Sequence, residues 1–419
     1  MGVSFRDIQQ EWFVVSLLAS SLDNTKPGPR TTDVIQMNTI SETIDSTITN
    51  TRAERFYRPE LDVLRFGAFL LVLIKHSFPS PDGPGMRLHL FRAIKHAGFF
   101  GVPLFFLLSA YLITELLLRE KRATGDVRIG AFYARRILRI WPLYLGMLFA
   151  AYIYGRIDHT TFIAKGELAA YLLLVGNWYV VLHGFMRGVA LPLWSIGVEE
   201  QFYLLWPSLV RCCSEMQIIA ASTTMLCVGQ ITLLYLSHRG AAIAPTIEAN
   251  SLVQFQFFAL GAIMSVALKG RTPGWTTFTR LCLSVWGLFC FFLADFLFYA
   301  ASTPVHATAI RTPPGFALAM LGTVLIFLSA LGAALPTVAS SLIYLGKISF
   351  GLYIFHLACI HLAIHVARSF FHLQHNFLAV VWGLGLPLTI LVAAASYHYI
   401  ERPFLRLKER FTVVRSRSV

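Results

Sequence analysis

Two ionisable side chains on one apolar stretch, Arg65 and His76, are the first candidates for chemistry. They belong to YRPELDVLRFGAFLLVLIKHSFP at 57–79, which also contains Asp62 and Lys75. Ionisable groups in a membrane helix are costly, so by default they face a polar interior and have a function there. The eleven-residue spacing is about three helical turns, or roughly 16 Å along one face. We therefore expect two ends of one substrate channel, the alternative being a snorkelling arginine and a satisfied histidine.

A pair of acids interrupts a second apolar stretch. The sequence PLWSIGVEEQFYLLWP at 192–207 contains Glu199 and Glu200. Two acids in the middle of a span must pair with a cation, bind a polar ligand or face water, so we expect them to have a function. A further histidine, His356, ends the apolar stretch LGKISFGLYIFH at 345–356.

Three arginines at helical spacing precede another apolar stretch. Arg135, Arg136 and Arg139 belong to FYARRILRIWPLY at 132–144. A guanidinium group binds phosphate through two parallel hydrogen bonds, so these residues predict a cytoplasmic anion site. The alternative is a positive-inside anchor followed by a belt of aromatic side chains.

Other polar positions give weaker indications. Ser109 lies in an apolar stretch where small residues also serve helix packing. Glu401 and Arg402 lie at the end of the last apolar stretch, where they can form an interfacial ion pair. We expect Pro403, which follows them, to end that helix.

The composition excludes a soluble globular domain. Of the 419 residues, 56% are hydrophobic and 14% are charged, whereas roughly a quarter are charged in soluble proteins. The long apolar runs predict an all-α, polytopic transmembrane helix bundle and not a β-barrel, whose strands alternate over about ten residues. The net charge of +13 indicates basic loops beside the spans, with lipid headgroups or an anionic substrate as partners and no nucleic acid. The six cysteines have no metal-ligand spacing, so we expect no metal.

Apolar segments and loop charges together predict the topology. We predict ten spans: 61–79, 98–118, 137–156, 192–211, 216–236, 252–268, 281–300, 315–335, 342–366 and 379–400. An eleventh candidate, 168–183, is shorter and less apolar. Ten spans put the basic loops and both termini in the cytoplasm, whereas eleven would put the basic C-terminal tail outside. We therefore favour about ten spans, with 157–191 as an outer segment that dips into the interface.

The ends of the chain differ in character from the rest. Residues 1–55 are polar and rich in Thr, Ser and Asn, and their apolar run is shorter than the roughly 20 residues of a span. We predict a disordered or loosely attached extension at 1–55, a membrane domain at 56–408 and a basic cytoplasmic tail at 409–419.

The residues by themselves leave two classes of function open. The first is a transferase that takes a phosphate-bearing donor from the cytoplasm and delivers a group to an acceptor at or across the membrane. The second is a proton-coupled transporter for an anion or an acyl group, in which His76, Glu199 and Glu200 carry the protons.

Six sequence motifs in a fixed order indicate the function more specifically than the separate residues do. They are Y-R-P-E-L-D-x-L-R with Arg-x10-His at 57–76, G-V-x-x-F-F-x-L-S-x-Y-L-I at 101–113, F-Y-x-R-R-x-x-R-I-x-P-L-Y at 132–144, P-L-W-S-x-x-V-E-E-Q-F-Y-L-L-W-P at 192–207, L-G-x-I-S-x-x-L-Y-x-x-H at 345–356 and Y-x-x-I-E-R-P at 397–403. Over residues 57–408 the chain resembles the acyltransferase-3 family of integral membrane acyltransferases, which includes bacterial O-acetylases. Val63 and Ala110 stand where that family often has glycine, both at packing positions.

The resemblance implies acyl-CoA, acetyl-CoA by default, as cytoplasmic donor and a multi-pass protein of the bacterial inner membrane. The implied acceptor is a carbohydrate hydroxyl of an exopolysaccharide, a lipopolysaccharide or a lipochitooligosaccharide. His76 matches the family's essential histidine, and we expect it to act as general base, with an acyl-histidine intermediate as the alternative. Arg65 matches the motif arginine and either holds the donor or pairs with a buried acid.

The resemblance also covers the remaining candidates. Arg135, Arg136 and Arg139 match the cytoplasmic arginine motif and are expected to hold the CoA phosphates. Glu199 and Glu200 are expected to orient a histidine or to bind the acceptor. The motif positions without an assigned role are Asp62, Ser109, Trp194, Ser195, His356, Glu401 and Arg402.

Overall fold

Helices make up the described part of the chain, which confirms the all-α prediction. The computed structural model describes residues 56–78, 85–157, 161–186, 188–302, 305–336, 339–371 and 377–412. Within these ranges the structure has no strand, only one isolated bridge between Ala242 and His306. The predicted extension at 1–55 and residues 413–419 of the predicted tail lie outside the described residues.

The first half of the described chain forms eight helices and one 3-10 turn. They are α3 (Pro59–Ser77), α4 (Met86–Ala97), η1 (Gly98–Phe100), α5 (Gly101–Thr124), α6 (Ile129–Ile157), α7 (Lys165–Leu172), α8 (Gly176–His183), α9 (Leu193–Cys212) and α10 (Glu215–His238). The second half adds α11 (Ser251–Leu268), α12 (Thr277–Phe296), α13 (Thr312–Ala330), α14 (Ser340–Lys347), α15 (Ser349–Phe371), α16 (Phe377–Val380), α17 (Leu386–Ser396) and α18 (Arg402–Lys408). Short π-helical or 3-10 turns are η3 (Ile243–Ile247), η5 (Val381–Gly385), η6 (Tyr397–Glu401) and η7 (Glu409–Phe411).

The helices support a multi-pass integral membrane protein. Eight helical runs in the described residues are long and apolar enough to cross a bilayer, and each contains most of one predicted span. The other two predicted spans form α3 and α9, of 19 and 20 residues, whose ionisable side chains make them less apolar. The eleventh candidate, 168–183, is divided between the short helices α7 and α8. The cytoplasmic location of the termini stays a prediction.

Two helical runs extend more than ten residues beyond one end of the predicted span. The helix at 98–118 begins much earlier, because α4, η1 and α5 form one run, Met86–Thr124. The expectation that Pro403 ends the last span is wrong, since that run continues to Phe411. Pro403 lies in the first turn of α18, directly after the π-helical turn η6. A proline inside a helix removes one hydrogen bond and displaces the carbonyl four residues earlier, so it distorts the run locally, as the adjacent π-helical turn shows, without ending it.

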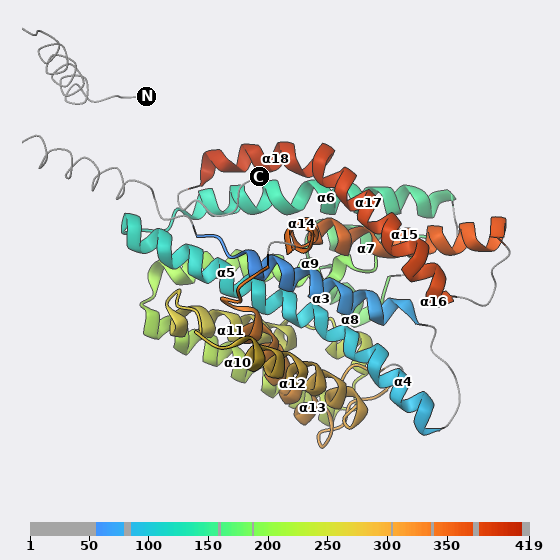
Figure 1. Ribbon diagram of the computed structural model, residues 1–419, viewed down its shortest axis with the longest axis horizontal. Coiled ribbons are helices and arrows are strands. Elements are labelled where there is room, and N and C mark those ends of the chain that lie inside the picture. The colour runs from blue at the N-terminus through green and yellow to red at the C-terminus, as the bar shows by residue number, and fades with distance from the viewer. Residues whose placement is uncertain are drawn as a thin grey trace, which may run out of the picture. The chain divides into compact units, whose positions relative to one another are not determined.

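Helices α3 and α5 lie side by side in the middle of the described unit (Figure 1). On one side α11 packs against α5 and α10, and α12 packs against α13. On the other side α15 packs against α17, and α18 packs against α6. Helix α3, which contains Arg65 and His76, therefore has protein on both sides.

Glycines allow the central helices to approach closely. A Cβ atom on Gly101 of α5 would lie 2.4 Å from the carbonyl oxygen of Ala68 on α3. A Cβ atom on Gly261 of α11 would lie 2.2 Å from the carbonyl oxygen of Leu107 on α5. Small residues are favoured where membrane helices pack, because they bring the two backbones into van der Waals contact.

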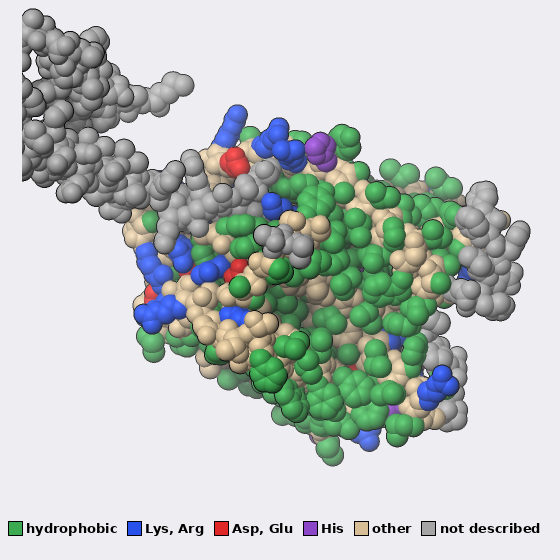
Figure 2. Space-filling view, viewed as in Figure 1, with side chains coloured by type: hydrophobic (Ala, Val, Ile, Leu, Met, Phe, Trp, Pro, Cys, Tyr) green, Lys and Arg blue, Asp and Glu red, His purple; other side chains and the backbone are tan. Residues whose placement is uncertain are grey.

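The surface is apolar over a wide area. Hydrophobic side chains cover the middle of the face shown in Figure 2, and most Lys and Arg side chains lie towards its left and upper edges. Exposed apolar side chains include Ile231, Leu391 and Tyr399. An apolar surface this large matches a membrane environment.

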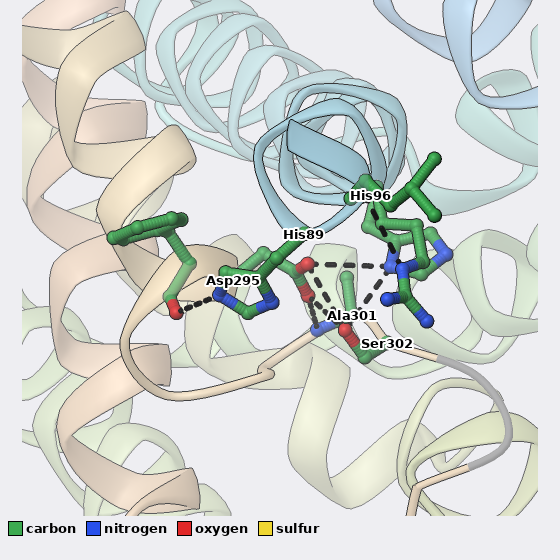
Figure 3. A network of polar contacts seen from close by, with 8 residues as sticks. His89, His96, Asp295, Ala301 and Ser302 are labelled. Carbon is green, nitrogen blue, oxygen red and sulfur yellow. Dashed lines mark hydrogen bonds and ion pairs between the residues drawn. The ribbon is translucent and has the colours of Figure 1, made fainter. Parts of the chain in front are cut away.

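A buried polar cluster joins α4 to the end of α12 and to the chain that follows it (Figure 3). The carboxylate of Asp295 accepts hydrogen bonds from the backbone N–H of Ala301 and from the Ser302 hydroxyl, both at 3.0 Å. Nδ1 of His96 lies 3.2 Å from Asp295 Oδ2 and 3.0 Å from Ser302 Oγ. His89, which lies beside the cluster, forms a hydrogen bond to the carbonyl oxygen of Phe296. The cluster satisfies the buried carboxylate and fixes α4, the helix that the sequence did not predict.

Candidate functional site

Two cavities lie along α3, one near Arg65 and one near His76. We call the first the arginine cavity. The polar and charged side chains that line it are Tyr57, Arg58, Asp62, Arg65, Ser109, Glu120, Arg135, Arg136, Arg139, Ser195, Glu199, Tyr203, Ser349, Tyr353, Lys408 and Thr412. Six of them are cationic and three are acidic, so the cavity suits an anionic ligand.

Arg65 pairs with a buried acid, one of the two roles predicted for it. Its Nη1 lies 2.7 Å from Asp62 Oδ1, and the side chains are 19% and 1% exposed. The hydroxyl of Tyr57 donates to the other oxygen of Asp62 at 3.0 Å. Both residues of the pair lie one turn apart on α3, so the helix itself sets the geometry.

The three arginines of the 132–144 motif line the same cavity from α6. Arg135 is engaged, because it bonds Glu120 at 3.1 Å and the carbonyl of Phe411 at 2.6 Å. Among the described residues, neither Arg136 nor Arg139 has a carboxylate within ion-pair distance, and Nε of Arg136 is buried without a hydrogen-bond partner. An anion bound in the cavity would therefore pair with these two guanidinium groups.

Glu199 projects from α9 into the arginine cavity. Ser109 donates to its Oε1 at 3.0 Å, and the hydroxyl of Tyr203 lies 3.2 Å from its Oε2. Glu200 lies outside both cavities and accepts a bond from Trp141 Nε1 at 3.3 Å. Neither acid bonds a histidine among the described residues. The roles expected for them, to orient a histidine or to bind the acceptor, stay predictions.

The second cavity, which we call the histidine cavity, holds His76 and His356. Its other lining residues are Val72, Lys75, Phe99, Val102, Phe185, Leu191, Pro192, Trp194, Ala244, Glu248 and Tyr353. The centres of the two imidazole rings are 5.3 Å apart, and the rings are tilted by 50°. Nδ1 of His356 lies 2.6 Å from the carbonyl oxygen of Tyr353. Two residues separated by 280 positions in the chain are therefore neighbours in space.

An ion pair that the sequence interpretation missed lies in the histidine cavity. Nζ of Lys75 is 3.2 Å from Glu248 Oε1 and 4.5 Å from the centre of the Phe99 ring. Lys75 was noted in the sequence, but Glu248, in the short connection between η3 and α11, was not. The sequence did contain a signal for Glu248, because it is an acid in the connection between two apolar spans.

Tyr353 and Val102 line both cavities and form their common boundary. The hydroxyl of Tyr353 lies 2.7 Å from Ser195 Oγ, and Ser195 donates to the carbonyl of Pro192 at 3.0 Å. Ser195 faces the arginine cavity and its neighbour Trp194 faces the histidine cavity. The α9 motif therefore contributes to both sides of this boundary.

The last motif lies apart from the two cavities. Glu401 is buried, and a Cβ atom on Gly351 of α15 would lie 3.3 Å from its Oε1. Arg402 begins α18 and lines neither cavity. Among the described residues, no group of three His, Cys, Asp or Glu side chains is placed to hold a metal ion.

Comparison with known proteins gives one family over most of the chain. A family model described as "Acyltransferase domain" matches residues 58–398. A protein of Staphylococcus aureus strain MSSA476, named "Putative O-acetyltransferase", is 26% identical over 376 residues, which cover 83% of this chain and 57% of that protein. The "Putative peptidoglycan O-acetyltransferase YrhL" of Bacillus subtilis is 26% identical over 389 residues, covering 83% and 55%.

A shorter match is closer in sequence. The peptidoglycan O-acetyltransferase OatA of Listeria monocytogenes is 33% identical over 168 residues, which cover 38% of this chain and 25% of that protein. The chain thus spans little more than half the length of the curated relatives that it matches along most of its own length. No solved structure matches it.

Proposed function

This chain belongs to the acyltransferase domain family, and from that premise we propose that it transfers an acyl group from acyl-CoA to a hydroxyl of a carbohydrate. The observation that carries the proposal is the arrangement of the two cavities. The arginine cavity has an excess of cationic side chains, and the histidine cavity contains two histidines. Tyr353 and Val102 line both cavities and form their common boundary. The first suits the phosphates of a CoA donor, and the second suits acid–base chemistry on a hydroxyl.

The donor half of the proposal rests on the arginine cavity. Arg136 and Arg139 have no carboxylate partner among the described residues, so they are available to pair with CoA phosphates. Arg135 lines the cavity beside them while it bonds Glu120. The thioester end of the donor would then extend along α3 towards His76.

The reaction half of the proposal rests on His76. Its imidazole accepts the proton of the acceptor hydroxyl while the hydroxyl oxygen attacks the thioester carbonyl carbon. A C–O bond forms, the C–S bond breaks, and the proton passes from the imidazole to the departing CoA sulfur. In the alternative route the imidazole nitrogen attacks the thioester carbon, an N–C bond forms as the C–S bond breaks, and CoA leaves as the thiol with the imidazole proton. The acceptor hydroxyl then attacks the acyl-histidine, which forms the ester C–O bond, breaks the N–C bond and returns the proton to the imidazole.

The acceptor is proposed to be a glycan at the outer side of the cytoplasmic membrane. Two of the relatives bear names that contain "peptidoglycan O-acetyltransferase", so a cell-wall glycan joins exopolysaccharide, lipopolysaccharide and lipochitooligosaccharide as a candidate. Acetyl is the acyl group that the relatives' names support.

Labelled acetyl-CoA tests the proposal in membranes that contain the full chain and their own glycans. We expect alkali-labile label in the glycan fraction with the wild type, and a loss of about 10²- to 10⁴-fold with His76→Ala, the range for a general acid–base group. His365→Ala is the matched control, because His365 is an exposed histidine of α15 that lines neither cavity. It should retain wild-type transfer.

The same membranes separate the two classes of function. Full transfer by His76→Ala at equal abundance would refute the catalytic assignment. A wild type that consumes no acetyl-CoA, yet moves an anion across proteoliposomes, would favour the transporter. Arg136→Met should raise the KM for acetyl-CoA more than it lowers the maximal rate, since it removes binding and not proton transfer.

A further inference from the structure

We infer that His356 is the positioning residue for His76: its Nε2 accepts a hydrogen bond from a ring N–H of His76, which directs the other ring nitrogen of His76 at the acceptor hydroxyl. The inference rests on the proposed function and assigns a role to a motif histidine that had none. It does not require His356 to touch either substrate.

The backbone fixes the tautomer of His356. Its Nδ1 lies 2.6 Å from the carbonyl oxygen of Tyr353. A carbonyl oxygen can only accept, so Nδ1 carries the proton and donates it. In the neutral ring Nε2 then has a lone pair and no hydrogen. His356 is therefore held as a hydrogen-bond acceptor at Nε2 by its own helix.

That acceptor is buried and lacks a partner. His356 is 0% exposed, and its Nε2 has no hydrogen-bond partner among the described residues. A buried polar atom without a partner is destabilising, and such atoms are rare enough to need an explanation. A donor supplied within the histidine cavity would satisfy it.

His76 is the side chain placed to supply that donor. The ring centres are 5.3 Å apart. An N–H···N bond of about 2.9 Å, plus the distance from each ring centre to its nitrogen, gives a separation of about 5 Å. The tilt of 50° excludes stacking and suits edge-to-edge contact. The bond is not formed in the structure, and rotation of the His76 ring about its χ2 angle is the movement that would form it.

The chemistry requires a partner of this kind. A neutral imidazole that accepts a proton at one nitrogen gains positive charge, and an acceptor at its other N–H stabilises that charge and fixes the ring. Of the acids on α3 and in the histidine cavity, Asp62 pairs with Arg65 and Glu248 pairs with Lys75. The third, Glu60, accepts a hydrogen bond from the backbone N–H of Gly332. His356 fills the place that a carboxylate holds in a serine-protease triad.

Two substitutions of similar size separate positioning from packing. His356→Asn keeps a donor near the place of Nδ1 but has no atom at the place of Nε2. His356→Gln carries its amide oxygen to the place of Nε2 and can accept from His76. With labelled acetyl-CoA in membranes that contain the full chain, we expect His356→Asn to lose about 10- to 100-fold in maximal rate, as other orienting contacts do. We expect His356→Gln to stay within about 10-fold of the wild type.

Two further readouts exclude a folding defect. The KM for acetyl-CoA should be unchanged in His356→Asn, because the proposed donor site is the arginine cavity. The double variant His76→Ala/His356→Asn should be no slower than His76→Ala alone, since residues that act as one unit are not additive. Membrane abundance and the midpoint of thermal unfolding are compared for every variant.

Each outcome decides for or against the inference. Wild-type activity in His356→Asn, or equal losses in the Asn and Gln variants, would overturn it while leaving His76 as the base. Additive losses in the double variant would overturn it as well. A wild type without any acetyl transfer, or an active His76→Ala, would instead overturn the proposed function, so the two failures are distinguishable.

Discussion

The ion pair between Arg65 and Asp62 gives the sharpest prediction on stability. Arg65→Met removes the cation and leaves the carboxylate of Asp62, which is 1% exposed, without its partner at 2.7 Å. Breaking a buried ion pair by removing one partner costs about 3–5 kcal/mol. The loss should be smaller here, because Arg65 is 19% exposed and the Tyr57 hydroxyl still bonds Asp62.

We therefore expect Arg65→Met to lower the free energy of unfolding by about 2–3 kcal/mol, or roughly 30- to 150-fold in the folding equilibrium. The double variant Asp62→Asn/Arg65→Met removes both charges and should return to within about 1 kcal/mol of the wild type. Acyl transfer should remain impaired in the double variant, because Arg65 also lines the arginine cavity. A recovery of stability without a recovery of transfer would separate the two roles of this arginine.

Thermal unfolding of the detergent-solubilised protein measures the first effect, and labelled acetyl-CoA measures the second. Arg122→Met is the matched control: its guanidinium group lies 2.7 Å from Glu215, but the side chains are 45% and 35% exposed. Solvent-exposed pairs contribute about 0–1 kcal/mol, so this variant should unfold close to the wild type. Equal unfolding midpoints for Arg65→Met and the wild type would refute the assignment of a buried pair.

Three further predictions concern packing and charge. Gly261→Ala should weaken the contact of α11 with α5, because its Cβ atom would lie 2.2 Å from a backbone oxygen, whereas Gly146→Ala has open space and should unfold like the wild type. Asp295→Ala should lower the free energy of unfolding by about 2–3 kcal/mol, because it leaves buried donors unpaired; a smaller loss than with Asp126→Ala would contradict this. The pKa of Asp126 is lowered by a backbone N–H and by Arg211, so its contribution is present above about pH 4 and is lost as pH falls through the lowered pKa. Unfolding midpoints between pH 3 and pH 6 should therefore depend less on pH in Asp126→Asn.

Local signals made the helices and several site residues predictable. Apolar runs located the spans, because hydrophobic length is a property of the chain alone. The spacing of Arg65 and His76 predicted that they lie about three turns apart on one helix, and the structure places both on α3, in different cavities. A channel that joins the two stays a prediction. Motif position also indicated Ser109 and Glu199, and the structure joins them by a hydrogen bond of 3.0 Å.

Long-range pairing was not predictable. Lys75 meets Glu248 across 173 positions, and His76 meets His356 across 280. Nothing in the local pattern around either residue specifies its partner, since the pairing depends on how distant helices pack. The surroundings of Glu199 and Glu200 were not predictable for the same reason: both acids are on α9, but its rotation directs Glu199 into the arginine cavity and Glu200 towards Trp141. Helix rotation is set by packing and glycine contacts, which a single sequence does not show.

The two cavities constrain any mechanism that joins them. Arg65 and His76 are on one continuous helix, α3, so their separation of roughly 16 Å is fixed by helical rise and cannot close by a loop movement. In the proposed mechanism, a donor held by the arginines brings its thioester along α3, past Tyr353 and Val102, to reach the histidines. Tyr353 links the two cavities, because its hydroxyl bonds Ser195 on the side of the arginine cavity while its carbonyl oxygen bonds His356 in the histidine cavity. A single residue thus links the boundary between the cavities to the tautomer of the histidine that is proposed to orient His76.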